Sequence, residues 1–260
     1  MPLIGFSTGA VALGDYARAL RILQRTSMNA VELSALRLSE LPTLIDALPQ
    51  LNLKQFSYVS VHAPSRFSFE DEDGVIKHLK RIPQEMPIIL HPDTIHDCAK
   101  WQLFGNQLAI ENMDRRKEVG RSAEELGQWF ERLPEAQLCL DLAHAHQVDR
   151  TMTEAYRILK LFNERVCQIH VSELDSTGHH FSLSYGSMRA YREISSIIPP
   201  AAPGIIESLS PFKELDDNAE IAWIELEAER ARFAIGKTAQ LPSNSIPSSA
   251  STATHRAVPA

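Results

Sequence analysis

Cysteine is rare in this chain. Its 260 residues include three, Cys98, Cys139 and Cys167, and none belongs to a Cys-x-x-Cys pair. This excludes a disulfide framework and a zinc knuckle made of thiolates, and it predicts a protein of the reducing cytoplasm. No window has about 18 consecutive apolar residues, and residues 1–6 lack the basic and apolar regions of a secretion signal. We therefore expect a soluble, cytoplasmic protein that does not insert into a membrane.

Positive charge is in the minority. Lys and Arg total 26 against 33 Asp and Glu, which gives a formal net charge of -7. Nucleic-acid-binding proteins neutralise phosphates with clustered Lys and Arg, so this balance disfavours a nucleic-acid partner and leaves a small molecule as the expected one. One local cluster is basic, namely Arg115, Arg116 and Lys117, with Arg121 nearby. It fits a solvated loop, a site for one sugar phosphate or a contact to a nucleic-acid strand, and these alternatives stay open.

A glycine-rich nucleotide loop is also missing, because the segment 5–9 reads Gly-Phe-Ser-Thr-Gly and lacks the GxGxxG pattern of dinucleotide-binding folds. The chain is 44% hydrophobic and 23% charged, which is typical of a globular protein. Short apolar runs alternate with longer amphipathic stretches, and this predicts strands that alternate with helices. The expected strands are 3–7, 30–33, 58–62, 88–91, 108–111, 137–141, 167–171 and 204–207. The expected helices are 15–27, 36–48, 70–82, 94–101, 122–133, 152–162, 188–198 and 217–234, and 94–101 is the shortest.

Eight strands that are apolar on both faces predict a closed parallel sheet, a single (β/α)8 TIM barrel of the α/β class over residues 1–236. An open doubly wound sheet is the alternative. Residues 237–260 are rich in Ser, Thr, Pro and Ala, so they cannot bury enough apolar surface to offset the entropy of ordering. We predict that they form a disordered tail, in which His255 has no role.

The polar residues that follow the strands are the main functional signal. Six of the eight expected strands end in a carboxylate or an imidazole, and these residues are His62, His91, Glu111, Asp141, His170 and Glu207. All C-terminal strand ends of a parallel barrel open onto one face, so these side chains should converge there. His144, His179 and His180 follow in adjoining loops. Nitrogen and oxygen ligands without thiolates suit Zn²⁺, Mn²⁺, Fe²⁺ or Mg²⁺, and the sequence does not choose among these divalent metals.

Other polar residues have structural interpretations. Glu32 ends the second strand and is either a wall of the pocket or an ion-pair partner. His78, His96, His146 and the charges within 225–232 are expected to face solvent. Substrate selectivity is expected to come from loop side chains such as Arg66, Phe67, Phe69 and Tyr185, and the substrate itself is not readable from the sequence.

The chain resembles the xylose isomerase-like TIM barrel superfamily, which includes sugar and sugar phosphate isomerases and epimerases and also endonuclease IV. The resemblance covers residues 3–234 and rests on the order and spacing of six motifs: SVHAP at 60–64, LHPD at 90–93, IEN at 110–112, CLDLAHA at 139–145, IHVSELDSTGHH at 169–180 and IIES at 205–208.

The resemblance implies a metal set and catalytic roles. Glu111, Asp141, His170 and Glu207 match the shared mononuclear metal ligands, and His62, His91, His144 and His180 match the positions that complete the multinuclear zinc site of endonuclease IV. In the family's epimerases two glutamates bind the metal and exchange protons on opposite faces of the substrate, which assigns catalysis to Glu111 and Glu207, with His144 orienting the substrate or a ligand. Relatives commonly associate, so a homo-oligomer is also implied.

The chain departs from the family at two places. Gly178 stands where the family often has an aspartate two positions before the last histidine, and the following turn reads Ser184-Tyr185-Gly186 in place of a GEG-like sequence. These departures bear on whether a third ion is held, and His179 is the one neighbouring side chain that could substitute for the aspartate.

Three functions therefore stay open. The first is a divalent-metal-dependent isomerase or epimerase that transfers a proton on a small sugar, sugar phosphate or related hydroxy-carbonyl compound. The second is a multinuclear zinc phosphodiesterase that acts on abasic DNA, as endonuclease IV does. The third is a ligand-binding barrel without activity. We rank the isomerase or epimerase first, because the chain has a single small basic cluster and a short connection after the fourth strand.

Overall fold

Alternating buried strands and amphipathic helices build a closed barrel in the computed structural model, which describes residues 3–212 and 217–236. The barrel strands run in the order β1-β10-β7-β6-β5-β4-β3-β2, and every neighbouring pair is parallel. They are β1 (Ile4–Ser7), β2 (Ala30–Ser34), β3 (Tyr58–His62), β4 (Ile88–Leu90), β5 (Leu108–Glu111), β6 (Gln137–Asp141), β7 (Val166–Val171) and β10 (Gly204–Ile206). The predicted TIM barrel is confirmed, and the open-sheet alternative is wrong.

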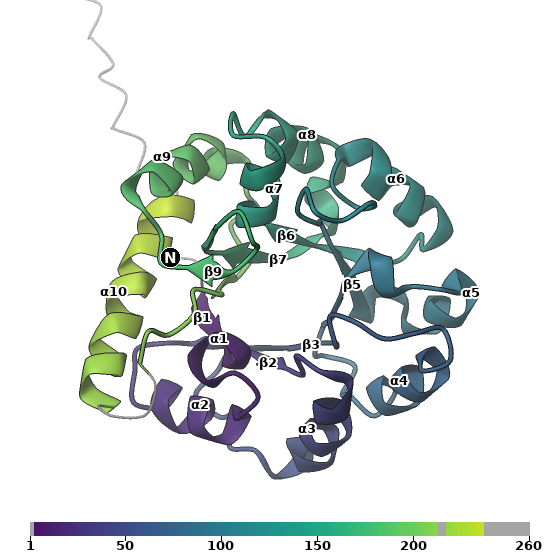
Figure 1. The fold of residues 1–260 in the computed structure, drawn as a ribbon, viewed down its shortest axis with the longest axis horizontal. Coiled ribbons are helices and arrows are strands. Elements are labelled where there is room, and N and C mark those ends of the chain that lie inside the picture. Colours follow the sequence, from purple (N-terminus) through teal and green to yellow (C-terminus); the bar gives the residue numbers. More distant parts are fainter. Residues whose placement is uncertain (1–2, 213–216, 237–260) are drawn as a thin grey trace, which may run out of the picture.

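Helices surround the barrel, which Figure 1 shows approximately end-on. They are α1 (Thr8–Ala12), α2 (Tyr16–Leu23), α3 (Leu41–Ala47), α4 (Glu72–Leu79), α5 (Cys98–Trp101), α6 (Ala123–Arg132), α7 (Leu142–Val148), α8 (Thr153–Phe162), α9 (Tyr185–Ile194) and α10 (Asp217–Ile235). Short 3-10 helices are η1 (Leu38–Glu40), η2 (Leu48–Gln50), η3 (Pro92–Thr94), η4 (Gln102–Gln107), η5 (Asn163–Arg165) and η6 (Ser195–Ile197). The two-residue strands β8 (Glu173–Leu174) and β9 (His180–Phe181) form a separate antiparallel pair.

Strand periodicity separates two sets of buried side chains. Residues such as Ile88, Ile110 and Leu138 join the main apolar core, whereas Ile89, Ala109 and Cys139 form a second, smaller cluster. Side chains two positions apart in a strand lie on the same face. Glu111 and Asp141 therefore share the face of Ala109 and Cys139, and this alternation places the carboxylates at the end of the barrel interior.

Several local predictions are wrong. The expected helix 94–101 is replaced by η3 and α5, because the Pro92 segment forms one 3-10 turn and Asp97 caps a separate short helix. Helices α1 and α7 and the β8–β9 pair were not predicted. Residues 237–260, with the predicted tail and His255, lie outside the described residues.

Some side chains predicted to face solvent are buried. Glu227 is fully buried and forms an ion pair with Arg230 within α10. His146 is half-buried, with its ring centroid 5.6 Å from that of Tyr191 in α9, and His78 is also half-buried. The sequence showed only the polar character of these residues, and their burial depends on packing between elements. His96 is exposed as predicted. Within residues 3–212 and 217–236, no helix has the length and apolar character needed to cross a membrane.

Candidate metal centre

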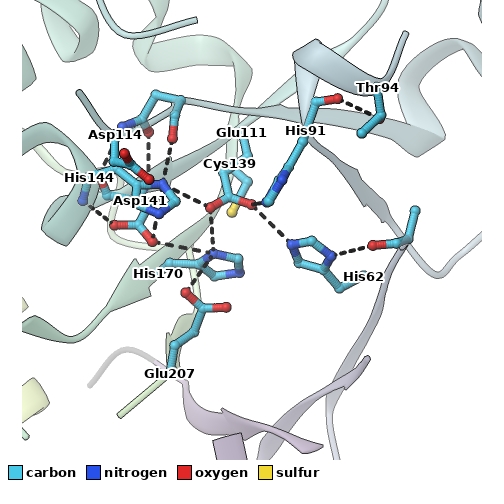
Figure 2. A network of polar contacts seen from close by, with 12 residues as sticks. His62, His91, Thr94, Glu111, Asp114, Cys139, Asp141, His144, His170 and Glu207 are labelled. Carbon is cyan, nitrogen blue, oxygen red and sulfur yellow. Dashed lines mark hydrogen bonds and ion pairs between the residues drawn. The ribbon is translucent and has the colours of Figure 1, made fainter. Parts of the chain in front are cut away.

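Glu111 lies at the centre of a cluster of imidazoles (Figure 2). Its Oε2 lies 3.1 Å from Nε2 of His62 and 3.3 Å from Nε2 of His91. Its Oε1 lies 3.2 Å from Nδ1 of His144 and 3.4 Å from Nδ1 of His170. The carboxylate is buried at the end of β5, so these contacts replace its hydration. One carboxylate thus joins residues from β3, from β7 and from the segments after β4 and β6.

Two more carboxylates reach the same imidazoles. Nδ1 of His170 lies 3.8 Å from Oδ2 of Asp141 and 3.3 Å from Oε2 of Glu207. Nδ1 of His144 lies 3.6 Å from the same Asp141 oxygen, and Nδ1 of His180 lies 3.6 Å from Oε2 of Glu207. In Figure 2, Glu207 approaches His170 from the side opposite Glu111.

The eight residues predicted as metal ligands fall into three overlapping sets. Within each set, one potential ligand atom per residue lies within 4.8 Å of the others. The sets are His62, His91 and Glu111; then Glu111, Asp141, His170 and Glu207; then Asp141, His144 and His180. Glu111 belongs to the first two and Asp141 to the last two. The structure thus brings every predicted ligand to one end of the barrel, and their roles as ligands stay predictions.

The four-residue set contains buried atoms whose polar capacity is unused. Oδ2 of Asp141 and Nδ1 of His170 are buried and have no hydrogen-bond partner among the residues that the structure describes. A buried carboxylate oxygen without a partner is costly, whereas a cation placed between these atoms would satisfy both. The donors are nitrogen and oxygen atoms, as borderline or hard divalent ions prefer. The residues present therefore fit a divalent ion.

Burial and opposite charges shift the protonation of the imidazoles. Burial lowers the pKa of His144, but Asp141 and Glu111 outweigh this effect and raise it to about 10. Burial likewise lowers the pKa of His62, while the hydrogen bond to Glu111 and the charge of Glu32 raise it to about 9. The pKa of His170 is raised well above its usual value against the effect of burial, because carboxylates surround it. In the ion-free protein these three imidazoles are therefore doubly protonated and cationic at neutral pH.

The remaining groups shift in other directions. Burial raises the pKa of Glu207 to about 8, and the charges of Glu111 and Asp141 act in the same direction. Burial also raises the pKa of Glu111, but the charges of His170 and His91 and the hydrogen bond from His144 hold it well below its usual range. Burial lowers the pKa of His180 to about 4. Glu111 is thus ionised at neutral pH, whereas Glu207 holds a proton in the ion-free protein.

Asp141 owes its orientation to the start of helix α7. It is the N-cap of the helix, and its Oδ1 accepts a hydrogen bond of 2.7 Å from the backbone N–H of His144. An aspartate at this position satisfies one of the open N–H groups of the first turn. The capping hydrogen bond uses Oδ1, so Oδ2 stays directed at His170. The same bond fixes the backbone of His144, three positions later. Asn112 holds the same segment, because its side chain bonds both the N–H and the C=O of Asp141.

Glu32 supports His170 from inside the barrel. Its Oε2 accepts a hydrogen bond of 2.9 Å from Nε2 of His170, and both residues are fully buried. Gln168 donates to the same Glu32 oxygen, and its own Oε1 accepts hydrogen bonds from Tyr58 and Ser60. When His170 is neutral, as a metal ligand must be, a proton on Nε2 bonds to Glu32 and the lone pair lies on Nδ1, the atom that faces Glu111 and Glu207. Glu32 is therefore an ion-pair partner, and its supporting residues were not predicted.

Gly178, where the resemblance led us to expect an aspartate, lies against the side chain of Arg116. Gly178 has a φ of +85°, and a Cβ atom there would lie 1.8 Å from the guanidinium carbon of Arg116. Arg116 is held in this place by Asp114, with Nε–Oδ1 and Nη2–Oδ2 distances of 2.9 and 2.7 Å, and by the carbonyl of Thr177. A guanidinium thus lies beside the position where the resemblance led us to expect an aspartate. His179 does not substitute for it, because its side chain is exposed and bonds Thr177 near Asp175.

A cavity of about 240 Å³ opens over the cluster, and we call it the mouth cavity. Its lining includes His62, His91, Glu111, His144, His180 and Glu207, together with Ser7, Ser34, Arg66, Arg116 and Lys117. The predicted basic cluster is therefore divided: Arg116 and Lys117 line the cavity, Arg121 forms an ion pair with Glu125, and Arg115 is an exposed side chain outside the lining. Of the other loop residues predicted to govern selectivity, Phe67, Phe69 and Tyr185 do not line it.

Comparisons with known proteins identify the fold. No protein-family model and no curated protein matches the chain. The structure resembles the 3-keto-D-glucoside 4-epimerase from E. coli (12% identity, TM-score 0.53, covering 87% of this chain and 100% of that one). It also resembles a protein from Anabaena variabilis described as a sugar phosphate isomerase/epimerase (13% identity, TM-score 0.57, covering 90% and 99%). A third is a xylose isomerase-like TIM barrel protein from Mycobacterium smegmatis in complex with magnesium (12% identity, TM-score 0.52, covering 85% and 90%). The chain therefore has the TIM barrel fold of these three proteins.

Proposed function

We propose that this protein is a divalent-metal-dependent isomerase or epimerase that moves a proton on a small sugar, sugar phosphate or related hydroxy-carbonyl compound. One observation carries the proposal: potential ligand atoms of the buried Glu111, Asp141 and His170 and of the half-buried Glu207 lie within 4.8 Å of one another, and Oδ2 of Asp141 and Nδ1 of His170 lack any hydrogen bond among the residues that the structure describes. Such an arrangement is costly in an ion-free protein and favourable around a cation.

The chemistry follows from the position of the set below the mouth cavity. A divalent ion held there would supply Lewis-acid polarisation of a carbonyl and its neighbouring hydroxyl, which makes the adjacent C–H more acidic. Glu207 lines the cavity with 15% of its side chain exposed, so it is placed to exchange a proton with a bound substrate. Glu111 also lines the cavity and is assigned the second proton exchange. His144, which also lines it, orients the substrate or Glu111.

The dimensions of the cavity support a small substrate. Pockets for drug-sized ligands commonly have volumes of about 300–1,000 Å³, and the mouth cavity has about 240 Å³. Ser7 and Ser34 line its wall and form a hydrogen bond of 2.6 Å with each other, which leaves one hydroxyl hydrogen and oxygen lone pairs for a sugar hydroxyl. A nucleic-acid duplex would need an extended cationic surface, and the chain carries a net charge of -7.

One observation favours phosphodiester hydrolysis as a second candidate. Glu111 and Asp141 each belong to two ligand sets, so they are positioned to bridge neighbouring ions as carboxylates do in multinuclear sites. The third set opposes this function, because Arg116 lies beside Gly178, where a further acidic ligand would be needed to offset the charge of another cation. We therefore rank it second.

The test combines metal content with turnover. The purified full-length chain is loaded with Zn²⁺, Mn²⁺ or Mg²⁺, the bound ions are counted, and solvent-deuterium incorporation is followed by NMR with a panel of ketoses, aldoses and their phosphates. We expect one tightly bound ion and deuterium exchange that Glu111→Gln and Glu207→Gln abolish, while the exposed control Glu85→Gln retains it. Three bound ions with Glu111-dependent cleavage of abasic-site DNA would reverse the ranking. Exchange that persists in both variants would refute the two-glutamate mechanism.

A further inference from the structure

A second cavity adjoins the mouth cavity on the side of β3, β4 and β5, and we call it the rim pocket. It has about 480 Å³ and is lined by residues 65–67, by Asp93 and Thr94, and by Arg116 and Lys117. Ser65, Arg66, Arg116 and Lys117 line both cavities, so the two are adjacent. The strands that supply His62, His91 and Glu111 thus also carry the loops of the rim pocket.

The rim pocket is cationic in a protein that is acidic as a whole. Three of its lining side chains are basic and one, Asp93, is acidic, whereas the chain has a net charge of -7. Lys117 is paired with Asp93, and Arg116 is paired with Asp114, which lies behind it and is buried. These pairs hold two cations in place at the edge of the pocket.

Arg66 is the exception among these cations. Its side chain has no hydrogen-bond or ion-pair partner among the residues that the structure describes, although it lines both cavities. A guanidinium presents five N–H donors in a fork that matches the oxygens of a phosphate, and binding of this kind is commonly bidentate. Ser65 adds a hydroxyl group to the same pocket, whereas the hydroxyl of Thr94 donates to the backbone carbonyl of His91. Arg66 is therefore a cation available to a ligand, beside two others that are already oriented.

We propose that the rim pocket binds the phosphate group of a phosphorylated sugar whose hydroxy-carbonyl end lies over Glu111 and Glu207. This inference rests on the proposed function for the reactive end of the substrate, whereas the anion site itself depends only on Arg66, Arg116 and Lys117. Binding of the phosphate at the rim would fix which end of the substrate lies over Glu111 and Glu207.

Inorganic phosphate is the first probe. It is titrated calorimetrically into the full-length chain, once loaded with metal and once treated with chelator, so that binding to a metal ion is separated from binding to the rim pocket. We expect binding in both states, weakened about tenfold or more by Arg66→Gln, as for loss of a hydrogen bond to a charged group. The matched control is Arg115→Gln, because Arg115 is an exposed arginine of the adjacent loop that lines neither cavity. Equal binding by both variants, or binding only when metal is present, would overturn the proposal.

A pair of substrates separates this proposal from the proposed function. Deuterium exchange is measured on ribulose 5-phosphate and on ribulose with the loaded protein. We expect Arg66→Gln to lower kcat/KM for the phosphate ester, mainly through KM, by about tenfold or more beyond its effect on the unphosphorylated sugar. Equal effects on both sugars would overturn the phosphate subsite. Arg66-dependent phosphate binding without exchange on either sugar would uphold the subsite and count against the proposed reaction.

Discussion

Metal binding should release protons in a number that the structure specifies. In the ion-free protein the pKa of His170 is raised well above its usual value against the effect of burial, because carboxylates surround it. Burial and neighbouring carboxylates raise the pKa of Glu207 to about 8. At pH 7 His170 is therefore cationic and Glu207 is neutral, and each must lose one proton to become a ligand. An ion that enters the set of Glu111, Asp141, His170 and Glu207 should displace about two protons.

The same count fixes how affinity depends on pH. Since the protons must leave, the apparent affinity falls as the pH falls, and a loss of two protons changes it about a hundredfold per pH unit below pH 7. The slope should decrease as the pH approaches the Glu207 pKa of about 8. A second ion in the set of His62, His91 and Glu111 would release another proton, because the hydrogen bond to Glu111 and the charge of Glu32 outweigh burial and raise the pKa of His62 to about 9.

Calorimetry measures this directly. Zn²⁺ is titrated into chelator-treated protein at pH 7 in buffers of different ionisation enthalpy, and the dependence of the observed heat on that enthalpy gives the number of protons released. Glu207→Gln should release about one proton fewer, because the amide does not ionise. Binding without proton release, or a Glu207→Gln variant with the wild-type count, would refute the assignment of these residues as ligands.

Three further predictions concern residues outside the ligand sets. Glu32→Gln should weaken metal binding by about 10–100-fold, because it removes the charged partner of His170 Nε2, and a wild-type affinity in the same calorimetric assay would contradict this. Glu72→Gln should lower the free energy of unfolding by about 1.5–3 kcal/mol at pH 7, because the buried carboxylate accepts hydrogen bonds from Trp101 and from the backbone N–H groups of His96 and Asp97. Burial raises the Glu72 pKa, but these hydrogen bonds lower it overall. The difference in the free energy of unfolding between the wild type and Glu72→Gln, measured in urea, should therefore disappear as the pH falls below the usual value of 4.5. A difference that does not depend on pH would show that the charge of Glu72 is not its cause. Gly178→Ala should displace Arg116 and destabilise the protein by about 1–2 kcal/mol, since the residue has positive φ, and an unchanged thermal unfolding midpoint would show that the loop adapts.

The convergence of the eight predicted ligands was readable because it depends on topology. In a parallel barrel every strand leads to the same face, so the positions of His62, Glu111, Asp141 and His170 in sequence were enough to bring them together. The direction of each side chain follows from the two-residue period of the strand. Neither inference needed knowledge of the packing between elements.

The supporting contacts needed distances between segments far apart in sequence. Glu32 and His170 are 138 residues apart, and nothing in either motif states that they bond. A partial signal existed, since Gln168 and Ser60 lie two positions before His170 and His62 and so share their faces. Helix α7 was missed because it has seven residues and carries two histidines, although Asp141 three positions before His144 is a capping signal.

The dual use of Asp141 joins the stability of a helix to the loading of the site. One oxygen of its side chain closes the first turn of α7, while the other is available to a cation, so the two functions draw on a single carboxylate. Asp141→Ala would remove the N-cap of α7 and the metal ligand together, and it would displace His144. Its effect would therefore combine local unfolding of the helix with the loss of metal binding. Asparagine retains the capping oxygen but replaces the other oxygen by an NH2 group, which cannot bind a cation, and it is therefore the substitution that removes the ligand while keeping the cap.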